Sequence, residues 1–310
     1  MTNNRSVAGA PKAVSPPVPP LVGLLIGICA ISTASTFIRL AQTSITSLAL
    51  AAWRLTLASL VLAPFALASC RAEWRRLTRR EWALLTLSGT VLAIHFYTWI
   101  TSLALTSVAA SIVLVSTNPF FVGLFSHFVL RERLQRHTAV GMIIAVVGSA
   151  IIGLGDWGEG QHQLTGELLA LAGAATVAVY LIIGRRLRER LSLLGYIFPV
   201  YGTAAVVLML VALLVGVPLT GYPATGWLWL VLIALIPQIL GHSSFNWALG
   251  HLPATYVSMA ALAEPIGSTL LAWGILQEPP TWITVAGGTL ILAGLGVATF
   301  RRRLAAETAP

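Results

Sequence analysis

The chain has 310 residues, of which 57% are hydrophobic and only 9% are charged. Soluble domains carry about 25% charged residues, so a chain this apolar could not cover its surface with polar groups in water. The net charge of +9 could suit nucleic acid, but the arginines lie in short connectors between apolar runs rather than in one cluster. Composition therefore excludes a soluble domain, disfavours nucleic acid as a partner and predicts an all-α membrane protein.

Residues 1–20 contain five prolines, which is typical of a disordered tail. Arg5 and Lys12 precede an apolar run, so a signal peptide is the alternative interpretation. A membrane helix needs about 20 mainly apolar residues. Ten segments meet this requirement: 21–39, 47–69, 82–104, 107–130, 137–155, 164–184, 193–217, 227–248, 252–276 and 281–300.

The Lys and Arg residues predict the orientation, because cytoplasmic connectors are enriched in them. With the N-terminus inside, 17 of the 19 basic residues lie in cytoplasmic segments, including the C-terminal tail 301–310. Arg39 alone lies outside, and Arg54 lies within a span. We therefore expect both termini in the cytoplasm and the chain in the plasma membrane, typically a bacterial inner membrane.

Polar residues within the spans of the first half are candidates for a binding site. Arg54 is a charge inside the second span. His95 and Trp99 are four residues apart in the third, so they share one helix face. Asn118 lies near the middle of the fourth and is followed by Pro119, which can kink a helix and act as a hinge.

The second half adds candidates in three spans. Tyr180 lies in the sixth span. Gln238, His242 and Asn246 are spaced by four in the eighth, which predicts a polar stripe that faces the bundle or a cavity rather than lipid. A hydrogen bond between helices is the alternative for His242. Glu264 lies deep in the ninth span, and Pro265 after it is a second candidate hinge.

Arg54 and Glu264 are costly inside a bilayer, so each is a functional candidate. Glu264 could couple transport to protons, bind a substrate ammonium, or serve the fold by bonding backbone that Pro265 frees. Arg54 could be structural, bind a substrate carboxylate, or pair with Glu264. Neither Cys29 nor Cys70 has metal-ligand spacing, and we expect no metal and no cofactor.

The two halves align at an offset of 146 residues. Asn118-Pro119 falls on Glu264-Pro265, and further pairs are Glu132 and Glu278, Gly141 and Gly287, Gly148 and Gly294, Gly27 and Gly173, and Arg39 and Arg185. Each half, 21–155 and 164–300, has five spans, so the halves would enter the membrane in opposite orientations. Such inverted repeats build alternating-access transporters. A duplication retained only for packing is the alternative.

Several motifs resemble those of the EamA-type transporters of the drug/metabolite transporter superfamily. They are Ser107-Val108-Ala109-Ala110-Ser111 before Asn118-Pro119 and Arg131-Glu132-Arg133, Leu252-Pro253-Ala254-Thr255 before Ala263-Glu264-Pro265 and Gln277-Glu278, and Ala51-Ala52-Trp53-Arg54. The resemblance covers about residues 21–300. It implies two inverted five-helix repeats around a central cavity, and export of amino acids, metabolites or drugs. Asn118 departs from the small hydroxyl or apolar residue expected there.

We therefore expect a carrier that exports amino acids or related metabolites by alternating access, driven by the substrate gradient or by proton antiport. Its cavity would be lined by the first, third, fourth, sixth, eighth and ninth spans. A multidrug exporter of the same fold is the alternative, followed by a channel, a lipid translocator or an intramembrane enzyme. No catalytic motif is found, so we expect no enzyme. We expect a lipid environment and a monomer.

Overall fold

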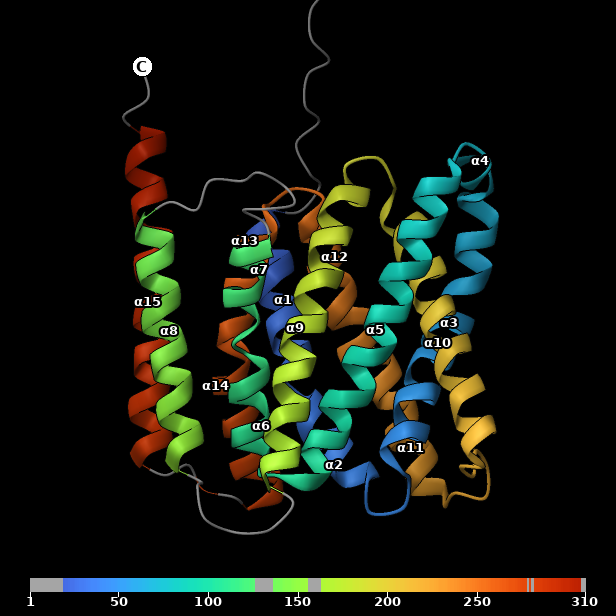
Figure 1. Ribbon diagram of the computed structural model, residues 1–310, viewed down its shortest axis with the longest axis horizontal. Helices are drawn as coiled ribbons and strands as arrows, with labels where there is room; N and C mark the ends of the chain where they lie inside the picture. Colours follow the sequence, from blue (N-terminus) through green and yellow to red (C-terminus); the bar gives the residue numbers. More distant parts are fainter. Residues whose placement is uncertain (1–18, 126–135, 156–162, 278, 280–281, 308–310) are drawn as a thin grey trace, which may run out of the picture.

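The computed structural model describes residues 19–125, 136–155, 163–277, 279 and 282–307. Within these residues all regular secondary structure is helical, and the long helices stand side by side (Figure 1). Helix α1 begins and α15 ends on the same side of the molecule (Figure 1). Residues 1–18 of the predicted tail and the repeat pair Glu132 and Glu278 lie outside the described residues.

The described residues of the first half, 19–125 and 136–155, form eight helices. They are α1 (Pro20–Ser32), α2 (Ala34–Ala41), α3 (Ser47–Ser69), α4 (Arg71–Trp74), α5 (Arg79–Leu105), α6 (Val108–Val115), α7 (Asn118–Phe125) and α8 (Arg136–Gly155).

The second half has more irregular helices. They are α9 (Gln163–Arg188), α10 (Leu193–Val215), α11 (Ala224–Ile233), the π-helical η2 (Ala234–His242), α12 (Ser243–Leu249), α13 (Ala254–Ala260), the 3-10 turn η3 (Ala261–Ala263), α14 (Glu264–Leu271), the π-helical η4 (Ala272–Leu276) and α15 (Trp282–Glu307). Helix α15 continues beyond the predicted span end at residue 300, because Leu304, Ala305, Ala306 and Glu307 are strong helix formers.

Seven helical segments of the described chain are long and apolar enough to cross a membrane: Pro20–Ala41, Ser47–Ser69, Arg79–Leu105, Leu164–Arg188, Leu193–Val215, Ala224–Leu249 and Ala254–Leu276. Three shorter apolar helices are Ala110–Phe125, Arg136–Gly148 and Val285–Gly294. The prediction of an all-helical membrane protein is confirmed, and the count of ten spans stays a prediction.

Local sequence specifies the helix ends. Thr78 begins α5 with a capping box: its backbone N–H donates to Glu81 Oε2 (2.8 Å), and the Glu81 N–H donates to its hydroxyl (3.2 Å). Helix α10 ends at Gly216, whose φ of 75° is strained for any residue with a Cβ. These ends fix where the connectors begin.

Contacts that tie α2 to α5 recur between α9 and α12 at the offset of 146 residues. Arg39 Nη1 donates to the Leu103 carbonyl, and Arg185 Nη1 donates to the Leu249 carbonyl (3.0 Å). Three positions further along, Gln42 Nε2 donates to the Ile100 carbonyl (2.7 Å) and Arg188 Nε to the Asn246 carbonyl (3.0 Å). The last four carbonyls of a helix have no partner within it, so Arg39 caps the end of α5 and Arg185 caps the end of α12.

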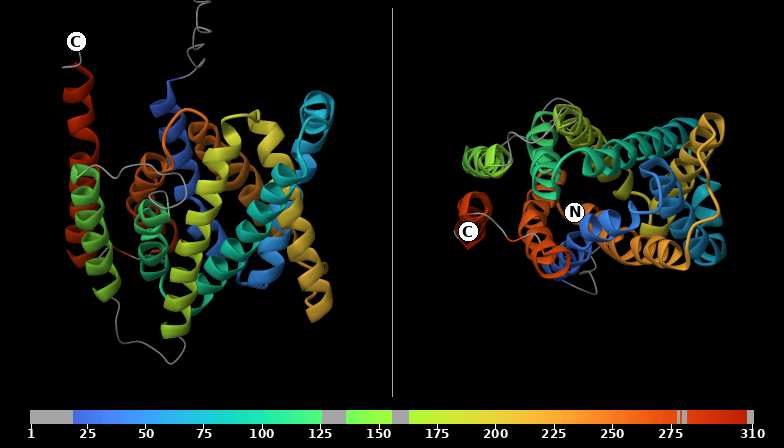
Figure 2. Two further views of the ribbon diagram at one scale, coloured as in Figure 1. Left: turned by 45° about the horizontal axis from the view of Figure 1, so that its top comes forward. Right: turned by 90° about the horizontal axis from the view of Figure 1, so that it is seen from below.

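Helices α8 and α15 pack tightly against each other at one edge of the molecule (Figures 1 and 2). A Cβ on Gly148 would lie 2.6 Å from the Gly287 carbonyl oxygen, and one on Gly294 would lie 2.5 Å from that of Gly141. Only glycine permits this approach. Each residue of the first contact is equivalent, at the offset of 146 residues, to a residue of the second. An approximate two-fold axis between the halves would relate the two contacts in this way.

The directions of equivalent helices also agree with a two-fold relation between the halves. In Figure 1, α1 runs downward and its counterpart α9 runs upward, while α3 runs upward and its counterpart α10 runs downward. Gly27 packs against Phe245, and its counterpart Gly173 packs against Trp99, the counterpart of Phe245. The two halves therefore repeat both their sequence and their contacts.

Three helices are interrupted within the bundle. Helix α1 ends before Thr33, α6 ends before Ser116, and η3 separates α13 from α14. The second segments of the latter two begin with Asn118-Pro119 and Glu264-Pro265. Proline fits the first turn of a helix, where its missing N–H leaves no bond unmade. Both prolines thus have a static role at helix starts, and their role as hinges stays a prediction.

Candidate functional site

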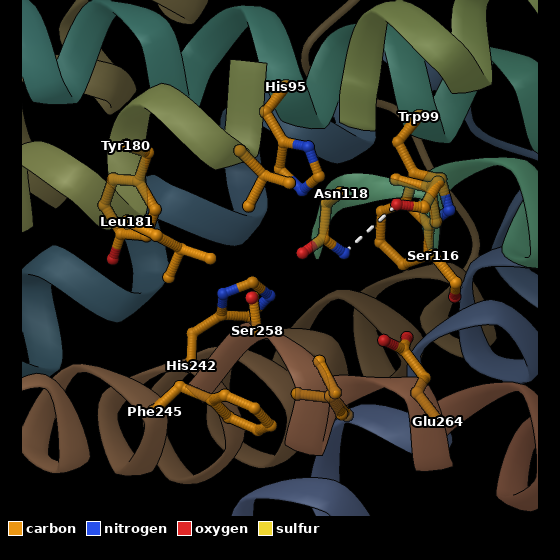
Figure 3. Close-up of a pocket in the computed structure, with 14 residues that line it drawn as sticks. His95, Trp99, Ser116, Asn118, Tyr180, Leu181, His242, Phe245, Ser258 and Glu264 are labelled. Atoms are coloured by element: carbon orange, nitrogen blue, oxygen red, sulfur yellow. Dashed lines mark hydrogen bonds between the residues drawn. The ribbon is translucent and has the colours of Figure 1, made fainter. Parts of the chain in front are cut away.

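A cavity lies between the interrupted helices, with an empty volume of about 620 Å³ that includes the space at its open side. Its polar or aromatic lining residues are His95, Trp99, Ser116, Asn118, Tyr180, His242, Phe245, Ser258 and Glu264, and the apolar ones are Ile31, Val115, Val177, Leu181 and Ala261 (Figure 3). They come from α1, α5, α6, α7, α9, η2, α12, α13, η3 and α14, with Ser116 directly after α6, and these elements lie within the first, third, fourth, sixth, eighth and ninth expected spans.

The lining is arranged in pairs related by the 146-residue offset. Four pairs line the cavity: Ile31 and Val177, Trp99 and Phe245, Val115 and Ala261, and Asn118 and Glu264. Eight of the fourteen lining residues therefore come from equivalent positions of the two halves. The cavity lies where the two halves meet.

The predicted site residues divide into two groups. Six line the cavity: His95, Trp99, Asn118, Tyr180, His242 and Glu264. Five are absent from the lining: Arg54, Gln238, Asn246, Pro119 and Pro265. The predicted stripe is divided, because η2 is π-helical and a spacing of four no longer keeps Gln238 in line with His242.

Sequence reasoning missed Phe245, Ser116 and Ser258. Phe245 could have been found, because it is the counterpart of Trp99 at the offset. Ser116 and Ser258 carry no comparable signal, because serine is common in packed membrane helices.

His95 has a fixed orientation. Its Nδ1 bonds the Gly173 carbonyl at 2.9 Å, and its ring stacks on Trp99 with centroids 6.0 Å apart. A carbonyl oxygen can only accept, so the hydrogen lies on Nδ1 and Nε2 of the neutral ring is left as an acceptor. Figure 3 shows His95 and His242 on opposite sides of the cavity.

Asn118 and Glu264 occupy equivalent positions at the starts of α7 and α14. Asn118 Nδ2 donates to the Val115 carbonyl (3.1 Å), while its buried Oδ1 has no protein partner. The Glu264 carboxylate points into the cavity (Figure 3). Among the described residues, no cation lies within 4 Å of it. Both side chains therefore offer acceptor oxygens to the cavity.

Arg54 lies behind the cavity wall and is 0% exposed. Its Nε donates to Gln238 Oε1 (2.6 Å), and its guanidinium lies over the Phe96 ring, 4.1 Å from the centroid. The Phe96 ring in turn contacts His242, with centroids 5.1 Å apart. Arg54 and Glu264 form no ion pair within 4 Å.

Tyr180 and Asn246 lead from the cavity into a buried polar region. The Tyr180 ring stacks on Tyr196 (6.3 Å between centroids), whose hydroxyl bonds Ser88 Oγ at 2.9 Å. Asn246 Nδ2 bonds the His242 carbonyl (2.7 Å), which holds the end of η2 in place. Asn246 therefore supports the site from behind.

The bundle of long apolar helices defines an integral membrane protein, and its cavity lies between two halves with repeated contacts. The sequence pattern of the EamA-like transporter family matches residues 19–154 and 164–300, one copy in each half. The chain belongs to the EamA-like transporter family.

Several curated proteins similar to this chain are called transporters, exporters or pumps. The uncharacterized transporter YetK of Bacillus subtilis is 22% identical over 62% of this chain, which spans 59% of YetK. The pseudopaline exporter CntI of Pseudomonas aeruginosa is 27% identical over 70% of this chain and 74% of its own length. A probable amino-acid metabolite efflux pump of Salmonella typhimurium is 28% identical over 63% of this chain and 68% of its own.

One solved crystal structure shares the fold, with a TM-score of 0.71 at 24% identity, and covers 92% of this chain and 99% of the other. This likeness concerns the architecture alone. The transport of a small molecule in a lipid bilayer follows from the family match and the named relatives.

Proposed function

We propose that the chain exports amino acids or related small metabolites across the plasma membrane by alternating access. The observation that carries this proposal is the paired lining: a cavity built from equivalent positions of two halves can open to either side when the halves exchange conformations. The exporter and the amino-acid metabolite efflux pump among the relatives support the direction and the substrate class.

The proposed topology has ten spans in two inverted repeats, with both termini in the cytoplasm. It is supported by the distribution of Lys and Arg, which places 17 of 19 on one side. The opposite directions of α1 and α9, and the shared side of the α1 start and the α15 end, support it as well (Figure 1).

The proposed substrate class follows from the lining. Acceptor oxygens of Glu264 and Asn118 suit an ammonium group, and the rings of Trp99 and Phe245 suit an apolar side chain. An amphipathic metabolite with a charged head and an apolar body would satisfy both.

Transport in proteoliposomes tests the proposal. Vesicles preloaded with unlabelled amino acids should accumulate the labelled amino acid by counterflow, with a rate that saturates. Flux without saturation or counterflow would indicate a channel instead, and counterflow only with apolar cationic drugs would indicate a multidrug exporter.

Proton coupling is tested with Glu264→Gln. If Glu264 couples transport to protons, the variant should keep counterflow but lose the acceleration that a pH gradient gives. Glu189→Gln, an exposed carboxylate at the end of α9, is the matched control. A Glu264→Gln variant that folds and keeps its dependence on the pH gradient would assign the carboxylate to the fold or to substrate binding.

A further inference from the structure

Four buried donor atoms from three residues gather beside the cavity without a protein acceptor. They are Arg54 Nη1, Arg54 Nη2, Gln238 Nε2 and Trp99 Nε1, which we call the donor cluster. The assignment of Gln238 is secure, because Arg54 Nε can only donate and must therefore face Oε1. All four atoms can then only donate hydrogen bonds.

The donor cluster is one region of the structure. Arg54 and Gln238 are joined by the 2.6 Å hydrogen bond, and the Arg54 guanidinium carbon lies 6.0 Å from the Trp99 ring centroid. Trp99 itself lines the cavity. The Phe96 ring separates the guanidinium from His242, another lining residue. The Arg54 guanidinium therefore lies one side chain away from the cavity, and Trp99 lies at the cavity wall.

Buried donors without acceptors lower the stability of the folded protein, so a purely structural role does not explain the donor cluster. A buried cation inside a membrane protein is normally paired, and apolar replacements of similar size cost less. Gln238 supplies only one neutral acceptor, and no carboxylate of the described residues lies within 4 Å of Arg54. The Gln238 amide also interacts with the Tyr201 hydroxyl, so the two Arg54 Nη atoms are the donors that call for an acceptor from outside the chain.

We propose that the donor cluster is the subsite for the carboxylate of the transported molecule. The two Nη atoms of a guanidinium match the two oxygens of a carboxylate, and the Gln238 amide and the Trp99 indole add neutral donors. The carboxylate enters when the Phe96 ring moves off the guanidinium. This inference rests on the proposed function and narrows it to acidic or zwitterionic substrates.

Other lining residues complete the recognition of a zwitterion. Glu264 and the Asn118 Oδ1 offer acceptors, while the donors gather around Arg54. A molecule with an ammonium group and a carboxylate thus meets opposite chemistry at its two ends. Decarboxylated amines and amino-acid amides keep the ammonium and lose the second contact.

Binding of matched acids and amides to the purified full chain tests the subsite. The twenty L-amino acids are screened by thermal shift, and each one that binds is compared with its amide. The wild type should bind the acid about 10- to 100-fold more tightly than the amide, as expected for charge-assisted bonds. Arg54→Gln should weaken binding of the acid to the level of the amide and leave the amide within about twofold.

Three further measurements make the result decisive. Arg75→Gln, an exposed arginine, should behave as the wild type. Arg54→Lys keeps the charge without the fork and should retain a smaller preference for the acid. Gln238→Leu should also reduce the ratio of the affinity for the acid to the affinity for the amide. If Arg54→Gln does not fold, Arg54→Lys and Gln238→Leu test the subsite instead. If both variants prefer the acid over the amide as strongly as the wild type does, the subsite is overturned.

Other outcomes also count against the proposal. Equal binding of acid and amide to the wild type, or an equal loss of both in Arg54→Gln, would leave the proposed function standing and overturn the subsite. Protection by chloride or acetate alone, dependent on Arg54 and as strong as that by the amino acid, would indicate an independent anion site. If no amino acid binds the wild type, the proposed function fails and the subsite falls with it.

Discussion

The two halves are alike at their helix ends and different at the cavity. Arg39 and Arg185 cap the counterpart helices α5 and α12 in the same way. By contrast, Asn118 in the first half stands where Glu264 stands in the second. The comparison teaches that the arginine caps are kept in both halves, whereas one lining position of the cavity carries an amide in the first half and a carboxylate in the second.

The donor cluster follows the same division. The counterpart of Arg54 is the buried Val200, and that of Trp99 is Phe245, which keeps the aromatic ring but has no N–H. A symmetric cavity would bind the two ends of a molecule alike. An organic substrate has different ends, so a carrier with two similar halves needs different residues at equivalent lining positions.

The largest expected effect breaks the shared caps. Arg39→Met and Arg185→Met should each destabilise the protein by about 1.5–3 kcal/mol, because each removes a charged hydrogen bond and leaves a helix-end carbonyl without a partner. Thermal unfolding in detergent measures both. Arg186→Met, an exposed neighbour, is the control. Unequal losses would show that the two caps do not have the same role.

A smaller effect is expected at the glycine contacts of α8 and α15. Gly148→Ala and Gly294→Ala should each cost about 1–2 kcal/mol, since crowding against backbone outweighs the gain in helix propensity. Gly288→Ala, where the nearest atom would lie 3.9 Å away, should be neutral or stabilising. Equal tolerance of all three variants in thermal unfolding would contradict the close approach.

The smallest effect on stability sharpens the difference at the cavity. Asn118→Ser should change the free energy of unfolding by less than about 1.5 kcal/mol, because it removes one neutral hydrogen bond. It should nevertheless change which amino acids are transported fastest in the counterflow assay, because Asn118 lines the cavity at the position equivalent to Glu264. If the ranking of transport rates stays the same, Asn118 does not contribute to substrate recognition.

Much of this comparison could be predicted from the sequence. The offset that aligned Asn118-Pro119 with Glu264-Pro265 also aligned Arg39 with Arg185, and the structure gives both arginines the same cap. This pair is visible because the same residue type makes the same contact in both halves, whereas the equivalent contacts of Gln42 and Arg188 are made by different residues and leave no such signal. The glycines where α8 and α15 cross are also identical at positions separated by the offset.

The partner of Arg54 could not be predicted. Gln238 lies on η2, and the spacing of four assigned it to the same face as His242. Pro237 lacks the N–H of a regular helix turn, and the wider π-helical turns around it direct Gln238 toward α3 instead. A contact between distant segments through a non-standard turn leaves no periodic signal.

The glycine contacts between α8 and α15 also bear on how the protein is made. Helix α8 packs chiefly against α15, the last helix of the chain. During synthesis α8 must therefore wait in the membrane until more than a hundred further residues have been inserted. Its close-packing glycines remain without their partner for that time, so a chain truncated before α15 should be recognised by quality-control proteases.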